Sequence, residues 1–253
     1  TAFVRLPSGA SLLHEGALTM EVWRAPDARL ELGEMRAAAG FVQYRAGELA
    51  ADRILHLMGI FAGVVGAAML VGIASGAAER PVFFASLVYS ICLLTMLGCS
   101  AAYNLASNGP RKAFLRQLDH AAIFLMIAGT YAPFTTCRLH GDWAIGMTAA
   151  IWTGAITGAA MKLICPRGLK RSSIVAYLAL GWLILLGIRP MLASVDALTA
   201  ILIGVGGVLY SIGVAFHLWR TLPFHNAIWH SFVLVAASCH YAAILHGVVL
   251  ARP

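Results

Sequence analysis

The side chains that could carry chemistry in this sequence are a few ionisable, hydroxyl and amide groups beside long apolar runs. Asp119 is the most distinctive, because only four acidic residues follow position 53 and the other three lie in predicted loops. Its carboxylate could cap the free N–H groups at the start of a helix. Alternatively, an ionisable group that faces other helices at the edge of a membrane belongs to a polar site. The sequence leaves both interpretations open.

Two pairs of polar residues have the i, i+4 spacing of a helix face. Ser100 is paired with Asn104 in this way, and Asn226 with His230, so the members of each pair lie about 6 Å apart along their helix axis. The other polar residues expected at the depth of Asp119 are His56, Tyr103, His120 and His225. Each residue alone could be a hydrogen-bonded core or interfacial side chain. Their coincidence at one depth favours a shared site.

The elements that must position these side chains are membrane-spanning helices. The chain of 253 residues is 60% hydrophobic and 11% charged, whereas an average soluble domain is about half apolar and about a quarter charged. Only helices and closed barrels satisfy their backbone groups in lipid, and period-2 alternation is absent. The sequence therefore predicts an all-α polytopic membrane protein. Its seven predicted transmembrane helices are 54–77, 82–105, 119–137, 143–164, 172–191, 197–219 and 226–250.

Residues 1–53 differ in composition from the rest of the chain. They contain six arginines and seven acidic residues, and no apolar run as long as the core of a signal peptide. We therefore predict a soluble N-terminal segment, 1–53, that precedes a transmembrane domain, 54–250.

The charges of the short loops predict the orientation of the helices. Eight Lys and Arg residues lie in one alternating set of loops, and four lie in the other set together with the C-terminus. Because positive loops stay in the cytoplasm, the N-terminus is predicted to be cytoplasmic and the C-terminus extracytoplasmic. The cytoplasmic ends of the first, second, third and seventh helices then carry the polar residues described above. The net charge of +7 is explained by these loops, so no nucleic-acid partner is predicted.

Several segments, in this order, resemble the hemolysin III and progestin/adipoQ receptor family of seven-helix membrane proteins. They are 47–56, 118–123 with 127–133, 177–182, 206–213 and 227–233. The likeness extends over roughly 47–250 and is strongest to the bacterial hemolysin III branch. The resemblance implies an integral protein of the bacterial inner membrane, and the topology of the adiponectin receptors agrees with the predicted orientation.

The resemblance also implies a zinc site near the cytoplasmic face. The family pattern is Ser-x3-His on the second helix, Asp on the third and His-x3-His on the seventh, with the Asp reaching the ion through water. Ser100, Asp119 and His230 match this pattern, whereas Asn104 and Asn226 occupy two of the three histidine positions. A neutral amide is a poor zinc ligand beside imidazole, so zinc binding at these positions is predicted to be weak or absent.

Three functions remain open from the sequence. A metal-poor member of the family would have a binding, signalling or structural role in lipid homeostasis. An active member would be a zinc-dependent amidohydrolase acting on ceramide-like lipids, with Asp119 and Ser100 as catalytic residues. The name of the bacterial branch also suggests a cytolytic or pore-related role, although no row of charged pore-lining residues is visible. Membrane lipids are the predicted partners, and the sequence does not give the oligomeric state.

Overall fold

The computed structural model describes residues 45–77, 79–107, 110–165 and 172–251, which form helices and short connections. In chain order the elements are α3 (Ala46–Ala74), α4 (Arg80–Leu105), α5 (Pro110–Cys137), α6 (Gly141–Ile164), α7 (Ser172–Gly181), the 3-10 helix η1 (Leu183–Gly187), α8 (Ile188–Ser194), α9 (Ala197–Leu218), α10 (His225–Ile244) and the π-helix η2 (Leu245–Val249). The all-α prediction is confirmed.

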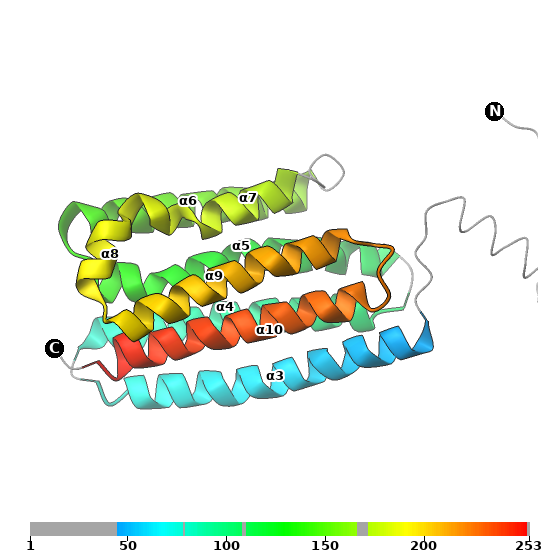
Figure 1. Ribbon diagram of the computed structural model, residues 1–253, viewed down its shortest axis with the longest axis horizontal. Helices are drawn as coiled ribbons and strands as arrows, with labels where there is room; N and C mark the ends of the chain where they lie inside the picture. The colour runs from blue at the N-terminus through cyan, green and yellow to red at the C-terminus, as the bar shows by residue number, and fades with distance from the viewer. Residues whose placement is uncertain (1–44, 78, 108–109, 166–171, 252–253) are drawn as a thin grey trace, which may run out of the picture. The chain divides into compact units, whose positions relative to one another are not determined.

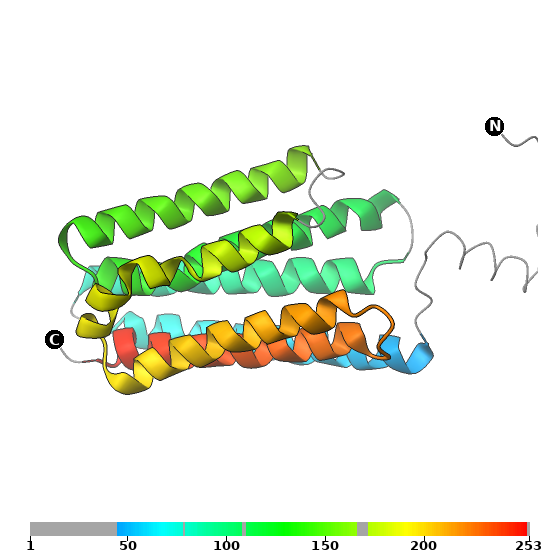
Figure 2. The same cartoon turned by 45° about the horizontal axis from the view of Figure 1, so that its top comes forward.

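The helices from Ala46 onward form one bundle in which the long helices run side by side (Figure 1). Each of α3, α4, α5 and α6 packs against the next in the chain, and α10 packs against both α9 and α3. Figure 2 shows the same bundle turned by 45°, with α6 at one side and α9 and α10 in front of α3 at the other. The first and last long helices of the bundle are therefore neighbours.

The first helix begins at Ala46, earlier than the predicted start at residue 54. Residues 46–53 are rich in Ala, Glu, Leu and Arg, which have high helix propensity, and Glu48 in the first turn complements the helix dipole. This corrects the predicted domain boundary: the end of the segment 1–53 belongs to α3. Asp52 consequently lies on the buried face of α3. The remainder of that segment, 1–44, lies outside the described residues.

Six helical segments are long and apolar enough to cross a membrane. They are 46–74, 80–105, 141–164, 173–194, 197–218 and 225–249. The predicted third helix, 119–137, lies within α5, which has 28 residues but whose apolar part is interrupted by Thr130, Tyr131 and Pro133. A polytopic membrane bundle is thus confirmed, whereas the number of seven spans stays a prediction.

The predicted helix 172–191 is interrupted in its middle. α7 ends at Gly181, and the chain continues through η1 into α8. The Tyr131 hydroxyl of α5 bridges the interruption, because it donates to the carbonyl oxygen of Gly181 (2.6 Å) and accepts from the amide of Ile184 (3.0 Å). A backbone group without a partner is costly in lipid. Tyr131 therefore supplies hydrogen bonds that the broken helix cannot make within itself.

Tyr131→Phe is expected to lower the free energy of unfolding by about 1–3 kcal/mol, because the carbonyl group of Gly181 and the amide of Ile184 lose their hydrogen-bond partner. Tyr89→Phe is the matched control, since Tyr89 is fully buried and its hydroxyl has no partner within the described part of the chain. Thermal unfolding in detergent should give a lower Tm for the first variant and an unchanged or higher Tm for the second. Equal losses in both variants would contradict the role assigned to Tyr131.

The N-cap of α9 is an ionised side chain with several partners. The Asp196 carboxylate accepts hydrogen bonds from the hydroxyl and the backbone amide of Thr199, and His246 Nε2 lies 3.0 Å from its Oδ2. These partners, and the Thr199 hydroxyl most strongly, lower the pKa of Asp196 from 3.8 to about 2. The cap is therefore expected to respond to acid.

The Tm of the wild-type protein should fall as the pH drops from 3.8 toward about 2. A carboxyl group whose pKa is lowered on folding stabilises the fold above its unfolded pKa, and that stabilisation is lost as the group is protonated. Asp196→Asn should make this fall smaller, and Thr199→Val, which removes the strongest partner, should act in the same direction. Differential scanning calorimetry across this pH range measures the effect. If the Tm of Asp196→Asn falls with pH as steeply as the Tm of the wild-type protein, the Asp196 carboxylate does not contribute to the acid response.

Candidate functional site

α3 places two ionisable side chains on the face that packs against α10. Asp52 and His56 have i, i+4 spacing, so they project from one side of the helix. Further along this face Gly59 has no side chain, and a Cβ atom there would lie 2.8 Å from Leu234 of α10. Gly59 thus permits the close approach of the two helices that brings their polar ends together.

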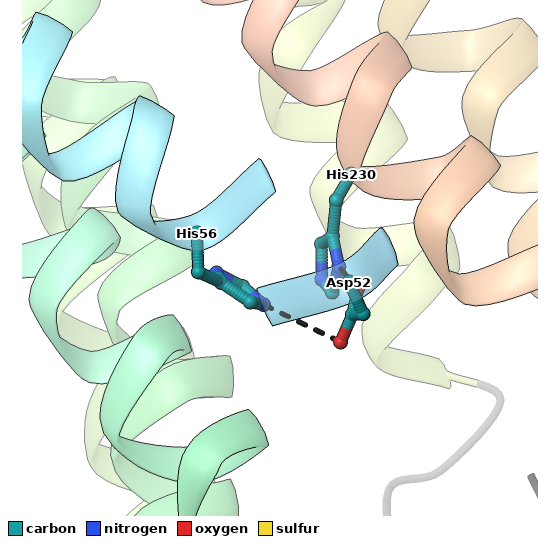
Figure 3. Close-up of side chains that lie close together, drawn as sticks. All are labelled: Asp52, His56 and His230. Atoms are coloured by element: carbon teal, nitrogen blue, oxygen red, sulfur yellow. Dashed lines mark hydrogen bonds and ion pairs between the residues drawn. The ribbon is translucent and has the colours of Figure 1, made fainter. Parts of the chain in front are cut away.

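His230 of α10 meets both of these side chains (Figure 3). Its Nδ1 lies 2.5 Å from Oδ1 of Asp52, and Nε2 of His56 lies 3.6 Å from Oδ2 of Asp52. The two imidazole rings contact each other edge to face, with centroids 4.4 Å apart. One potential ligand atom from each residue lies within 4.8 Å of the others. We refer to Asp52, His56 and His230 as the triad.

The triad is shielded from solvent. His56 is 6% exposed, and the side chains of Asp52 and His230 are 11% and 12% exposed. Nε2 of His56 is buried and has no hydrogen-bond partner among the residues that the structure describes. Buried polar atoms nearly always have a partner. Apart from the 3.6 Å contact with Asp52, Nε2 of His56 is therefore available to a further group, such as a water molecule or a metal ion.

Asn104 and Asn226, which occupy the altered histidine positions, adjoin the triad. Nδ2 of Asn226 donates to Oδ2 of Asp52 (3.5 Å) and to Oδ1 of Asn104 (3.4 Å). Nδ2 of Asn104 donates to the backbone oxygen of Ser100 (2.9 Å). In this arrangement the Asn226 amide presents an N–H donor to a carboxylate, which is a suitable role for an amide but not that of a cation ligand.

Asp119 of α5 interacts with both Ser100 and the triad. Its carboxylate is close enough to the Ser100 hydroxyl and to His230, His56 and Asp52 to interact with them electrostatically. The capping interpretation is wrong, because α5 begins at Pro110 and Asp119 lies well inside the helix. The carboxylate instead interacts with the charges of the triad without being one of its three potential ligands.

Three further predicted residues are not members of the triad. Tyr103 carries the ammonium group of Lys112 over its ring, at 5.6 Å from the centroid. His120 accepts a hydrogen bond at its backbone oxygen from the Tyr177 hydroxyl (2.8 Å). His225 is the buried first residue of α10. None of the three belongs to the group of potential metal ligands found in the described residues.

Asp52 is the site residue that sequence reasoning did not find. The predicted first helix begins at residue 54, so Asp52 falls in the soluble segment and only His56 is placed in the helix. A signal was nevertheless present, because Asp52 and His56 have i, i+4 spacing within the segment 47–56 that carries the family resemblance. An ionisable pair at that spacing, next to an apolar run, marks one face of a helix end.

The bundle and its buried group of potential metal ligands define a polytopic helical membrane protein with a candidate metal site at one end. Residues 51–241 match the family model described as Haemolysin-III related, and this range contains the whole triad. The chain therefore belongs to the haemolysin-III related family.

Named relatives are similar over most of their length. Hemolysin-3 of Bacillus cereus is 33% identical over 199 residues, which cover 79% of this chain and 91% of the relative. The Hemolysin-3 homolog of Bacillus subtilis is 29% identical over 195 residues, with coverage of 77% and 92%. Monocyte to macrophage differentiation factor of Homo sapiens is 29% identical over 205 residues, with coverage of 78% and 83%. No solved structure matches the chain.

Proposed function

We propose that this protein binds one divalent transition metal ion at the triad, with zinc as the best fit, and hydrolyses an amide or ester bond of a membrane lipid. The observation that carries the proposal is the convergence of three potential ligand atoms within 4.8 Å, one from each residue of the triad. Two imidazoles and one carboxylate are a known ligand set of catalytic zinc, and three protein ligands leave one position for water or substrate.

Zinc bound in this way would lower the pKa of a bound water molecule and polarise the carbonyl group of a substrate. The residues around the triad are suited to the remaining tasks. Asp119 interacts with the Ser100 hydroxyl and with the triad but is not one of the three potential ligands, so its carboxylate can accept a proton from water and return it to a leaving group. Asn226 donates to Asp52 and orients that carboxylate.

The position of the triad supports a lipid substrate. It lies between two helices that meet the length and hydropathy of membrane spans, α3 and α10, near the end of both. Many large apolar side chains of α3 are exposed, including Leu57, Met58 and Phe61, so this surface suits acyl chains. Ceramide-like lipids, whose amide lies near the headgroup, are the substrates that the family resemblance implies.

Purified wild-type protein is expected to carry about one zinc ion per chain, as a three-ligand site requires, and His56→Ala is expected to carry far less. His140→Ala is the matched control, because His140 is exposed at the start of α6. Elemental analysis gives the zinc content, and a panel of ceramides and phospholipids gives the activity. Zinc that remains bound after His56→Ala would contradict the proposed ligand set.

A metal-free role is the second candidate, favoured by the 2.5 Å contact between Asp52 and His230. Here the carboxylate would link α3 to α10 directly, and the protein would bind or sense a lipid without hydrolysing it. Metal-free wild-type protein that still binds lipid would support this candidate.

The name Hemolysin-3 of the Bacillus cereus relative adds a cytolytic role as an alternative, which leakage from protein-containing liposomes would test.

A further inference from the structure

A cavity of about 300 Å³ lies at the end of the bundle opposite the triad. It lies where the C-terminal end of α5 meets the connection from α8 to α9 and the π-helix η2, at the end where Figure 1 shows α8. The lining residues are Arg138, Ser194, Val195, Asp196, His246, Gly247, Leu250 and Ala251. Its volume is at the lower limit of ligand pockets, which suits a small polar group.

The cavity contains both a cation and an anion. Arg138 donates its Nε–H to the backbone oxygen of Gly247 (2.7 Å). This single bond orients the guanidinium and leaves its terminal N–H groups without an acceptor in the described part of the chain. Asp196 and His246 form an ion pair at 3.0 Å, and their side chains are 50% and 48% exposed, so a ligand can reach them. A guanidinium and a carboxylate are thus presented together.

The backbone that carries these groups is held firmly. A Cβ atom at Gly247 would lie 2.4 Å from the Thr199 side chain, so the π-helix packs directly on the first turn of α9. Thr199 in turn donates to Asp196, which caps that helix. Short π-helices are frequently found at functional sites. The separation of the cationic and anionic groups is consequently set by the fold rather than by mobile loops.

We propose that this cavity binds a zwitterionic group that contains a phosphate and a primary ammonium, as in the phosphoethanolamine headgroup of a phospholipid. The guanidinium of Arg138 presents paired N–H donors that fit phosphate oxygens. The half-exposed Asp196 carboxylate accepts hydrogen bonds from a primary ammonium, which a choline group cannot donate. Val195 and Leu250 provide apolar walls beside these groups. The inference is independent of the metal site, since the cavity is at the other end of the bundle.

The test uses the full chain in nanodiscs that contain equal amounts of phosphatidylethanolamine, phosphatidylcholine and phosphatidylglycerol, followed by native mass spectrometry of retained lipid. Wild-type protein should retain phosphatidylethanolamine about tenfold over phosphatidylcholine, as expected for a charge-assisted hydrogen bond. Asp196→Asn, which can still cap α9, should remove this preference. Arg138→Gln should reduce retention of all three lipids, and Arg189→Gln, at an exposed arginine of α8 outside the cavity, should have no effect.

Soluble phosphoethanolamine distinguishes the two sources of the same chemistry. If the occupant is a lipid, millimolar phosphoethanolamine should compete weakly, because it lacks the acyl chains that contact the apolar walls. If soluble phosphoethanolamine displaces the bound lipid as effectively as phosphatidylethanolamine does, the occupant of the cavity is a free solute with the same two groups. An undiminished preference for phosphatidylethanolamine in Asp196→Asn, with wild-type Tm, would overturn the proposal, and so would retention that Arg138→Gln leaves unchanged.

Discussion

Asp52→Ala combined with His56→Ala is expected to remove nearly all bound zinc, and adding Asn104→His and Asn226→His to that variant is expected to restore it. The first pair removes two of the three ligands and leaves only His230. Loss of a neighbour that merely orients a ligand weakens metal binding about 10–100-fold, so loss of two direct ligands should exceed this. The second pair supplies two imidazoles beside His230, at side chains that already lie 3.4 Å apart.

Zinc content and affinity are measured by elemental analysis and by competition with a chelating dye. The control is the quadruple variant with His230→Ala, in which no set of three ligands remains and zinc should stay absent. Zinc binding in the variant that also lacks His230 would show that the ion binds at a place other than the triad. Full zinc content in the Asp52→Ala, His56→Ala variant would show that the triad is not the metal site, whatever the activity of the protein.

Asp119→Asn is expected to lower the rate of lipid hydrolysis by about 10²–10⁴-fold while the zinc content stays at the wild-type level. This range is typical of the loss of a general base. Asp119 interacts with the triad and with the Ser100 hydroxyl, but it is not one of the three potential ligands. Asp142→Asn is the matched control, because Asp142 is an exposed acid in the first turn of α6.

Rates and zinc content must be measured on the same preparations. If Asp119→Asn loses zinc together with activity, Asp119 is a ligand rather than a base. If both zinc content and rate are unchanged, the proton is accepted elsewhere. Ser100→Ala should cause a smaller loss than Asp119→Asn, since Ser100 acts by orienting the carboxylate.

The depth at which polar residues occur could be predicted from the sequence, but the side chains that face each other could not. The apolar runs and the loop charges place four polar residues at one end of the helices: His56, Asn104, Asn226 and His230. In the structure His56 contacts His230, and Asn226 contacts Asn104. The rotation of α3 about its axis depends on how closely it packs on α10 at Gly59. Asp52 joins the site because α3 begins at Ala46 and lies close to α10.

Helix boundaries and interruptions were the other features that the sequence did not provide. The charged residues of 46–53 suggest a soluble segment, although these residues form the start of α3. The contact of Asp52 with His230 offsets the cost of burying the carboxylate there. The interruption after Gly181 is equally hidden, because the Tyr131 hydroxyl that accommodates it belongs to a helix fifty positions earlier. An average of hydropathy along the sequence contains no information about such pairwise contacts.

The triad joins residues that are far apart in the order of synthesis. Asp52 and His230 are 178 positions apart, and they belong to the first and last long helices of the bundle. During translation the N-terminal ligands reach the membrane well before their partner is made, since chains emerge at about 5–20 residues per second. A chain that ends before α10 could insert its earlier helices but would lack His230. Under the proposed function, metal occupancy of the triad would thus report that the first and last long helices have come together.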